Sequence, residues 1–302
     1  MPIKEMVVDA ARAGRVDRIV AALTGRSRAL VRGLIQHGCV QINRSPCRSD
    51  FDRVAPGDVV TVTYNEERKY REASKAPVEP PFPIYFEDEY LLVVEKPAPW
   101  LTVPTPKGET DTLMHHLQAY LSHGKKRTSR IEVVQRLDRG VSGVLVFGKT
   151  PAVGKALAEQ FASTKPEREY IALVAGRVEA EQGRFDQWLI TDKTSLQRRV
   201  APRPGVGEPA ITHYQVVARG PRVTRVLVRL ETGRRNQIRV HFAHAGHPVL
   251  GDPRYGGELS FHPRWPHRRM ALHAAVLGFT HPVTGQSLRF TSPVPAEFDS
   301  VC

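Results

Sequence analysis

Apolar residues near the N-terminus recur at the spacing of an α-helix. They fall one turn apart on one predicted helix face, at Val16, Ile19, Val20 and Leu23. A second stripe follows between Ser27, which can cap a helix start, and Gly38, which can end one. Strand-like alternation then appears at 40–43 and, after a Pro-Gly-Asp turn, at 59–62. The sequence therefore predicts two helices followed by a β-hairpin.

The longer C-terminal part switches between strand-like and helix-like patterns. Runs rich in β-branched and aromatic residues predict strands at 90–94, 144–147, 170–174, 214–217 and 223–230. Helical patterns predict helices at 152–162 and 237–245. This part is therefore expected to form a domain of mixed α and β structure.

A polar stretch separates the two parts. Half of the residues from 65 to 80 are charged, and the stretch ends in prolines, which is typical of a solvated linker. We therefore predict a small module at 1–64, a linker at 65–80 and a large domain at 81–302.

Net charge narrows the class of partner. The 302 residues include 44 Lys and Arg against 31 Asp and Glu, which gives a formal net charge of +13. Such an excess attracts polyanions, so RNA or DNA is the leading partner. A basic protein that binds no nucleic acid is the alternative.

Cysteine usage and hydropathy bear on the compartment. The three cysteines, Cys39, Cys47 and Cys302, are an odd number without CxxC spacing, so neither a disulfide framework nor a zinc site is predicted. No apolar run approaches the roughly 18 residues of a membrane span. The first residues also lack the apolar stretch of a signal peptide. We expect a soluble protein of the reducing cytoplasm.

One acidic residue has an unusual setting. Asp138 lies between Arg136 and Arg139, ahead of the apolar run at 144–147. Nearby cations favour the ionised form of a carboxylate, which suits a nucleophile or a proton acceptor. A structural ion pair at a strand entrance is the alternative, and this segment taken alone favours that alternative.

The N-terminal pattern resembles the α-L RNA-binding module, which a small-subunit ribosomal protein shares with several RNA-modifying enzymes. Two helices with clustered arginines (Arg26, Arg28 and Arg32) precede a GxVxIN turn and a Pro-Gly-Asp turn in the expected order. The resemblance spans roughly residues 14–63 and implies that these arginines follow the phosphates of structured RNA. A small dimerisation or packing domain with a basic surface is the alternative.

Four ordered segments resemble the RluA-type pseudouridine synthases: RLDRGVSG at 136–143, REYIALVAG at 168–176, TGRRNQIRVH at 232–241 and ALHA at 271–274. The intervening GHPVLGD at 246–252, with Tyr255 and Gly256, is also similar to the family's segment after its TGR motif, and the resemblance spans roughly residues 84–296. It implies an α+β fold, in which a mixed, largely antiparallel β-sheet flanked by helices follows the small RNA-binding module. It also implies that Asp138 is the catalytic aspartate, that Tyr170 stacks on the target base and that Arg239 pairs with Asp138. Arg136 matches an arginine that contacts RNA around the flipped nucleotide.

The implied reaction converts uridine to pseudouridine in structured RNA. The base must leave its stack, detach from ribose, turn and rejoin through a ring carbon, all without access to water. Ionised Asp138 can attack the anomeric carbon or remove the neighbouring 2′ proton, and the sequence leaves both routes open. No metal, nucleotide or redox cofactor is expected. Ribosomal RNA is the favoured partner, transfer RNA is a second candidate, and a monomer is expected.

Two other functions use the same residues. A ribosome-assembly factor would keep the fold and clamp RNA without turnover, whereas a nucleosidase would use the same carboxylate and admit water. The combination of Asp138, Tyr170 and Arg239 favours the synthase, because a protein that only binds RNA has no physical need for all three.

Two further patterns are rejected as sites. Gly143–Thr150 fits the GxxxxGKT pattern of a phosphate-binding loop, but its middle residues favour a strand. His241, His244 and His247 have metal-like spacing, yet Gly246 is expected to end the helix before His247. We expect packing or phosphate contacts for these histidines.

The chain also departs from the family pattern. Gln135 stands where the family commonly has His, and Arg235-Asn236 stands where it commonly has Thr-His. We expect these departures to affect how RNA is held and which uridine is chosen, rather than the reaction itself.

Overall fold

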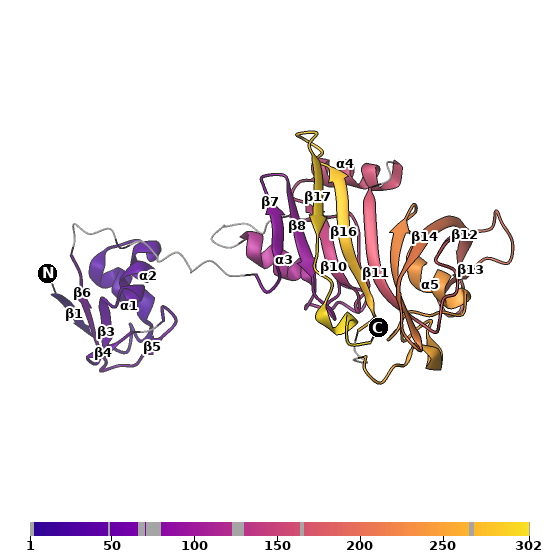
Figure 1. Ribbon diagram of the computed structural model, residues 1–302. Coiled ribbons are helices and arrows are strands. Elements are labelled where there is room, and N and C mark those ends of the chain that lie inside the picture. The colour runs from indigo at the N-terminus through magenta and orange to yellow at the C-terminus, as the bar shows by residue number, and fades with distance from the viewer. Residues whose placement is uncertain are drawn as a thin grey trace. The chain divides into compact units, whose positions relative to one another are not determined.

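The structure is a computed structural model that describes residues 3–47, 49–65, 70, 80–122, 130–163, 166–265 and 269–301 (Figure 1). The chain divides into two compact units, Met1–Val78 and Glu79–Cys302. Most of the predicted linker at 65–80, like Cys302, lies outside the described residues, so its boundaries stay a prediction. Among the described helices, none has both the length and the apolar character needed to cross a membrane.

The first unit contains both predicted helices, α1 (Val16–Thr24) and α2 (Arg28–Gln36). The apolar stripes face inward and form the core of this unit, so the helical periodicity was interpreted correctly. Gly38 follows α2 with a φ of 69°, as expected of a helix stop. Ser27 occupies the N-cap position of α2, but its side chain makes no capping hydrogen bond.

A small antiparallel sheet completes the first unit. It has the order β1-β6-β3-β4, with bounds Ile3–Val7, Val59–Thr63, Val40–Ile42 and Ser45–Pro46; a separate pair joins β2 (Gly14–Arg15) to β5 (Arg53–Val54). The two predicted strands, β3 and β6, do pair. The hairpin, however, joins β3 to β4, with Asn43 and Arg44 between them in the left-handed conformation.

The second unit is built on one mixed sheet, and eleven strands belong to it within the described residues. Nine follow the order β13-β12-β14-β15-β11-β16-β10-β8-β7, while β17 pairs with β16 and β9 pairs with β10. Only the pairing of β10 with β16 is parallel among these strands. The predicted α+β fold with a largely antiparallel sheet is confirmed.

The strand bounds are β7 Ile84–Glu87, β8 Leu91–Lys96, β9 Glu132–Val133, β10 Ser142–Gly148, β11 Glu167–Ala175, β12 Gln182–Thr191, β13 Arg198–Val200, β14 Glu208–Arg219, β15 Val223–Leu230, β16 Leu272–Thr280 and β17 Ser287–Thr291. All five strands predicted in this unit are present. The phosphate-loop pattern lies in buried β10 from Gly143 to Gly148, so its middle residues form a strand, which agrees with its rejection.

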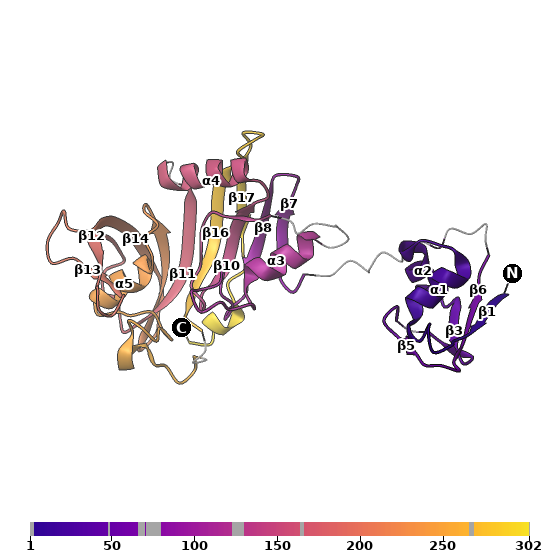
Figure 2. The same cartoon turned by 180° about the vertical axis from the view of Figure 1, so that it is seen from behind.

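Helices cover both faces of this sheet (Figure 2). On one face, α3 (Leu113–Ser122) and α5 (Gln237–His244) pack into the main core together with alternate residues of β10, Leu145 and Phe147. On the other face, α4 (Pro151–Ser163) packs with the intervening β10 residues. Two short 3₁₀ helices, η1 (Gly257–Ser260) and η2 (Ala296–Phe298), follow. The face that carries α5 also carries the site described next.

Candidate active site

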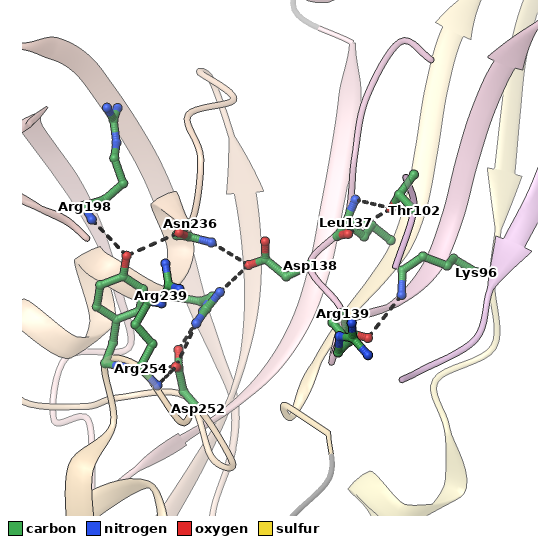
Figure 3. Close-up of polar contacts among 11 residues, drawn as sticks. Lys96, Thr102, Leu137, Asp138, Arg139, Arg198, Asn236, Arg239, Asp252 and Arg254 are labelled. Carbon is green, nitrogen blue, oxygen red and sulfur yellow. Dashed lines mark hydrogen bonds and ion pairs between the residues drawn. The ribbon is translucent and has the colours of Figure 1, made fainter. Parts of the chain in front are cut away.

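Asp138 lies in the loop between β9 and β10, and neighbouring side chains fix the backbone of that loop (Figure 3). The Thr102 hydroxyl donates to the Leu137 carbonyl at 2.9 Å and accepts from the Leu137 amide at 3.1 Å. On the other side of Asp138, the Lys96 ammonium donates to the Arg139 carbonyl at 3.4 Å. The loop is therefore held on both sides of its carboxylate.

Lys96 is a buried cation at the end of β8. Its ammonium also donates to the carbonyl oxygens of Pro97 at 3.1 Å and Trp100 at 2.6 Å. Burial lowers the pKa of Lys96 to about 7, and the charge of Asp138 opposes that shift. Lys96 is therefore electrostatically coupled to Asp138.

Arg239, from α5, links Asp138 to a second carboxylate. Its Nη1 donates to Asp138 Oδ2 at 2.5 Å, while Nε and Nη2 donate to the two oxygens of Asp252 at 2.7 and 2.9 Å. Burial alone would lower the pKa of Arg239, but hydrogen bonds and charge from Asp252 and Asp138 raise it overall. The guanidinium is therefore a permanently charged partner that Asp252 locks in one orientation.

Asn236 provides a second donor to the same oxygen of Asp138. Its Nδ2 lies 2.7 Å from Asp138 Oδ2, and the Tyr255 hydroxyl donates to its Oδ1 at 3.3 Å. Among the described residues, none donates a hydrogen bond to the other oxygen, Oδ1. Because the Asp138 side chain is 33% exposed, that oxygen is available to a ligand.

Tyr170, on β11, is half-buried and packs against the main core. Burial raises its pKa, and the charge of Asp138 adds to the shift while that of Arg168 opposes it. The phenol is therefore neutral at physiological pH and electrostatically coupled to Asp138. A neutral aromatic ring suits stacking on a base.

The two arginines that flank Asp138 in sequence do not hold it. Arg136 is exposed, and Arg139 donates to Glu109 at 3.5 Å. The cation that pairs with Asp138 is instead Arg239, 101 positions away. The sequence pattern predicted an ionised carboxylate from the two flanking arginines, but neither of them pairs with Asp138. The reason is that side chains of neighbouring residues in an irregular loop point in different directions.

The arginines predicted to bind RNA lie in the first unit. Arg26 and Arg28 are exposed around the start of α2. Arg32 is also exposed, and its Nε pairs with Asp50 Oδ2 at 3.2 Å. Two of the three arginine positions therefore present their charge to solvent, while part of the third is neutralised by Asp50.

The histidine series has separate structural environments. His241 is buried, with Nδ1 at 2.9 Å from the Thr212 hydroxyl, whereas His247 Nδ1 lies 2.9 Å from the Ala175 carbonyl. Burial lowers the pKa of His241 to about 4. Helix α5 ends at His244, as expected. In the part of the chain that the structure describes, no group of three or more His, Cys, Asp or Glu side chains is placed to hold a metal ion.

Several groups around Asp138 were not predicted from the sequence. Asn236 was expected to affect RNA handling, but it contacts the Asp138 carboxylate directly. Asp252 and Tyr255 lie in a segment that fits the family pattern, and this was the signal that could have identified them. Lys96 and Thr102 gave no signal, because their contacts with the loop depend on the fold.

The second unit is a mixed sheet that carries a carboxylate held through one of its oxygens, and the first unit presents exposed arginines. Together these features fit an enzyme that modifies RNA. A sequence profile described as RNA pseudouridylate synthase matches residues 90–244, and the S4 domain profile matches residues 14–60. The second match coincides with the predicted α-L module.

Similar proteins support the same class. "Uncharacterized RNA pseudouridine synthase YlyB" of Bacillus subtilis is 35% identical over 94% of this chain and 91% of its own length. "Ribosomal large subunit pseudouridine synthase D" of Zymomonas mobilis is 35% identical over 98% and 96%. Among solved structures, "Human RNA Pseudouridylate Synthase Domain Containing 1" matches with 25% identity and a TM-score of 0.57, over 71% of this chain and 84% of its own. The chain belongs to the RNA pseudouridine synthase family.

Proposed function

We propose that this enzyme isomerises uridine in structured ribosomal RNA, with Asp138 as the catalytic residue, Arg239 as its charge partner and Tyr170 as the stacking surface for the flipped base. The observation that carries the proposal is the asymmetry of the Asp138 carboxylate. Two donors occupy Oδ2, and Oδ1 accepts no hydrogen bond from the described residues. One oxygen is thus held while the other can reach a ribose.

The reaction follows from that asymmetry. Either Oδ1 attacks the anomeric carbon, or it removes the 2′ proton; in both routes the glycosidic electron pair leaves with the uracil nitrogen. The detached base turns against Tyr170 and bonds through C5 to the anomeric carbon. In the first route this bond displaces Oδ1 of Asp138 from the anomeric carbon, and in the second route Asp138 returns a proton to the 2′ carbon. The C5 proton is then lost, and the ring nitrogen gains a proton. Arg239 stabilises the carboxylate whenever it is charged. None of these steps calls for a metal or an organic cofactor.

The substrate assignment rests on three features. Relatives named ribosomal large subunit pseudouridine synthase D align over nearly the whole chain, the S4 domain is an RNA-binding domain, and the net charge is +13. Within this proposal, residues 1–64 bind RNA through Arg26, Arg28 and Arg32, and residues 81–302 perform the chemistry. Arg136 contacts RNA beside the flipped nucleotide. The enzyme acts as a monomer in the cytoplasm.

Mapping pseudouridine in total RNA from cells with and without the gene tests the proposal. We expect one or more positions in large-subunit ribosomal RNA to lose pseudouridine without the gene. Loss confined to transfer RNA would overturn the ribosomal assignment and keep the reaction. An unchanged map would favour the non-catalytic assembly factor.

A further inference from the structure

Asn236 lies at the start of α5 but does not cap the helix with its side chain. It is the N-cap residue of α5, where asparagine is among the most favoured residues because its side chain can satisfy free backbone amides. Its side chain makes no capping hydrogen bond, and its backbone is left-handed, with φ 57° and ψ 19°. The carboxamide instead extends to Asp138, 98 positions earlier in the chain.

The orientation of this carboxamide follows from its neighbours. The Tyr255 hydroxyl accepts a hydrogen bond from the Arg198 amide at 3.1 Å, so its own proton is directed to Asn236 Oδ1. That leaves the Asn236 amide nitrogen facing Asp138, where a carbonyl oxygen would be repelled. The Tyr255 ring also lies 4.9 Å from the Arg239 guanidinium. Tyr255 thus contacts both groups that hold the carboxylate.

We infer that Asn236 is a positioning residue for Asp138 and that Tyr255 sets the orientation of its carboxamide. This inference rests on the proposed catalytic role of Asp138. With Arg239 alone, the carboxylate could turn about its terminal bond and exchange its two oxygens. A second donor on Oδ2, from a different direction, opposes that rotation and keeps Oδ1 toward the ribose. The departure from the family's common His therefore bears on the chemistry.

Asn236→Gly is the primary test. Glycine adopts the left-handed backbone without strain, and the native side chain makes no capping bond, so we expect the variant to fold. Single-turnover conversion is measured with excess enzyme on total RNA from cells that lack the gene. We expect the maximal rate to fall by about 10- to 100-fold, which corresponds to losing one hydrogen bond to a charged group. The half-saturating enzyme concentration should stay within about threefold.

Asn43→Gly is the matched control. Asn43 is also left-handed, with φ 51°, and its Nδ2 also donates to a carboxylate, Asp58 Oδ1, at 2.8 Å. That hydrogen bond closes a turn of the first unit rather than holding Asp138. We expect Asn43→Gly to keep the wild-type maximal rate at saturating enzyme.

Asn236→Asp separates positioning from a structural role. Aspartate is at least as good a helix N-cap, so a structural role predicts equal or higher thermal stability with normal turnover. Positioning predicts a maximal rate below that of Asn236→Gly, because an acceptor replaces the donor beside Asp138. Tyr255→Phe should slow turnover by about 2- to 10-fold, and should add little once Asn236 is glycine, since the two residues act as one unit.

The results also separate this inference from the proposed function. If Asp138→Asn is inactive but Asn236→Gly turns over at the wild-type rate, only the inference is overturned. If Asp138→Asn itself stays active, the catalytic role proposed for Asp138 fails. Equal reductions of rate in Asn236→Gly and Asn43→Gly would show a general effect of the substitution and would overturn the positioning role.

Discussion

Each unit contains a hydrogen bond from an asparagine side chain to an aspartate carboxylate, but the two carboxylates differ in which of their oxygens are occupied. In the first unit, Asn43 donates to Asp58 Oδ1 at 2.8 Å, and the Ala55 amide donates to Asp58 Oδ2 at 2.7 Å. Both oxygens are occupied, and the Ala55 amide, with help from Asn43, lowers the pKa of Asp58. In the second unit, both donors converge on Oδ2 of Asp138.

The difference lies in which oxygen is left open. Asp58 is a half-buried residue beside a turn, and its two oxygens accept from the Asn43 side chain and the Ala55 amide, so its hydrogen bonds stabilise a loop. Asp138 has a buried arginine on one oxygen and a partly solvent-exposed carboxylate. Asp58, with hydrogen bonds to both oxygens, therefore stabilises a turn. Asp138, held through Oδ2 alone, keeps Oδ1 available for the proposed reaction.

Replacing Arg239 should have the largest effect. Arg239→Gln leaves Asp252, which is fully buried, without its cation, so we expect a decrease of about 3–5 kcal/mol in the free energy of unfolding. We also expect kcat to fall by about 100-fold or more. Urea denaturation and single-turnover assays measure the two effects.

The exposed counterpart in the first unit is Arg32, which pairs with Asp50. Arg32→Gln should change the free energy of unfolding by less than about 1 kcal/mol. Similar decreases in the free energy of unfolding for Arg239→Gln and Arg32→Gln would contradict the expected difference between buried and exposed arginines.

His241 should make the second unit sensitive to acid. Because burial lowers the folded-state pKa of His241 to about 4, the unfolded state binds more protons between about pH 6.5 and 4. Stability should therefore fall as pH falls through this window, by roughly 3 kcal/mol in total, and this decrease should be absent above it. Thermal unfolding of His241→Phe across that range should show a shallower pH dependence.

The exposed arginines of the first unit should have the smallest individual effects. Arg26→Gln and Arg28→Gln should each weaken RNA binding by less than about tenfold and flatten its salt dependence by roughly 0.7–0.9 for each phosphate that the variant no longer neutralises. Lys155→Gln removes an exposed charge from α4, which packs on the sheet face opposite the site, and serves as control. Binding titrations at several salt concentrations compare the three, and equal slopes would remove the RNA-binding role from Arg26 and Arg28.

Local pattern was enough to predict elements whose apolar residues are periodic. Helices α1, α2, α4 and α5 and strands β8, β10, β11, β14 and β15 fall where the sequence placed them. Strand β16 was missed because its buried run, Leu272–Thr280, includes small residues and shows no alternation. A Cβ on Gly143 would come within 2.2 Å of the Ala274 backbone, so the parallel pairing of β10 with β16 depends on a close approach that neither segment shows alone.

The site was predictable only in part, for a similar reason. Asp138, Tyr170 and Arg239 were predicted as site residues through the resemblance of whole segments to a family, and the hydrogen bond between Arg239 and Asp138 agrees with the predicted pairing. The positions of Asn236 and Tyr255 around the carboxylate depend on how α5 and the following loop pack, which no local pattern encodes. The prediction that Arg136 and Arg139 hold Asp138 was wrong, because residues adjacent in sequence need not have side chains in contact within a loop.

The most direct test compares Asp138→Asn with Asp58→Asn in the purified 302-residue chain. Single-turnover conversion and RNA affinity are measured on total RNA from cells that lack the gene. We predict that Asp138→Asn forms no pseudouridine while its RNA affinity stays within about threefold of wild type, a change below about 1 kcal/mol. Asp58→Asn should keep the wild-type maximal rate. Pseudouridine formation by Asp138→Asn at the wild-type rate would contradict the account.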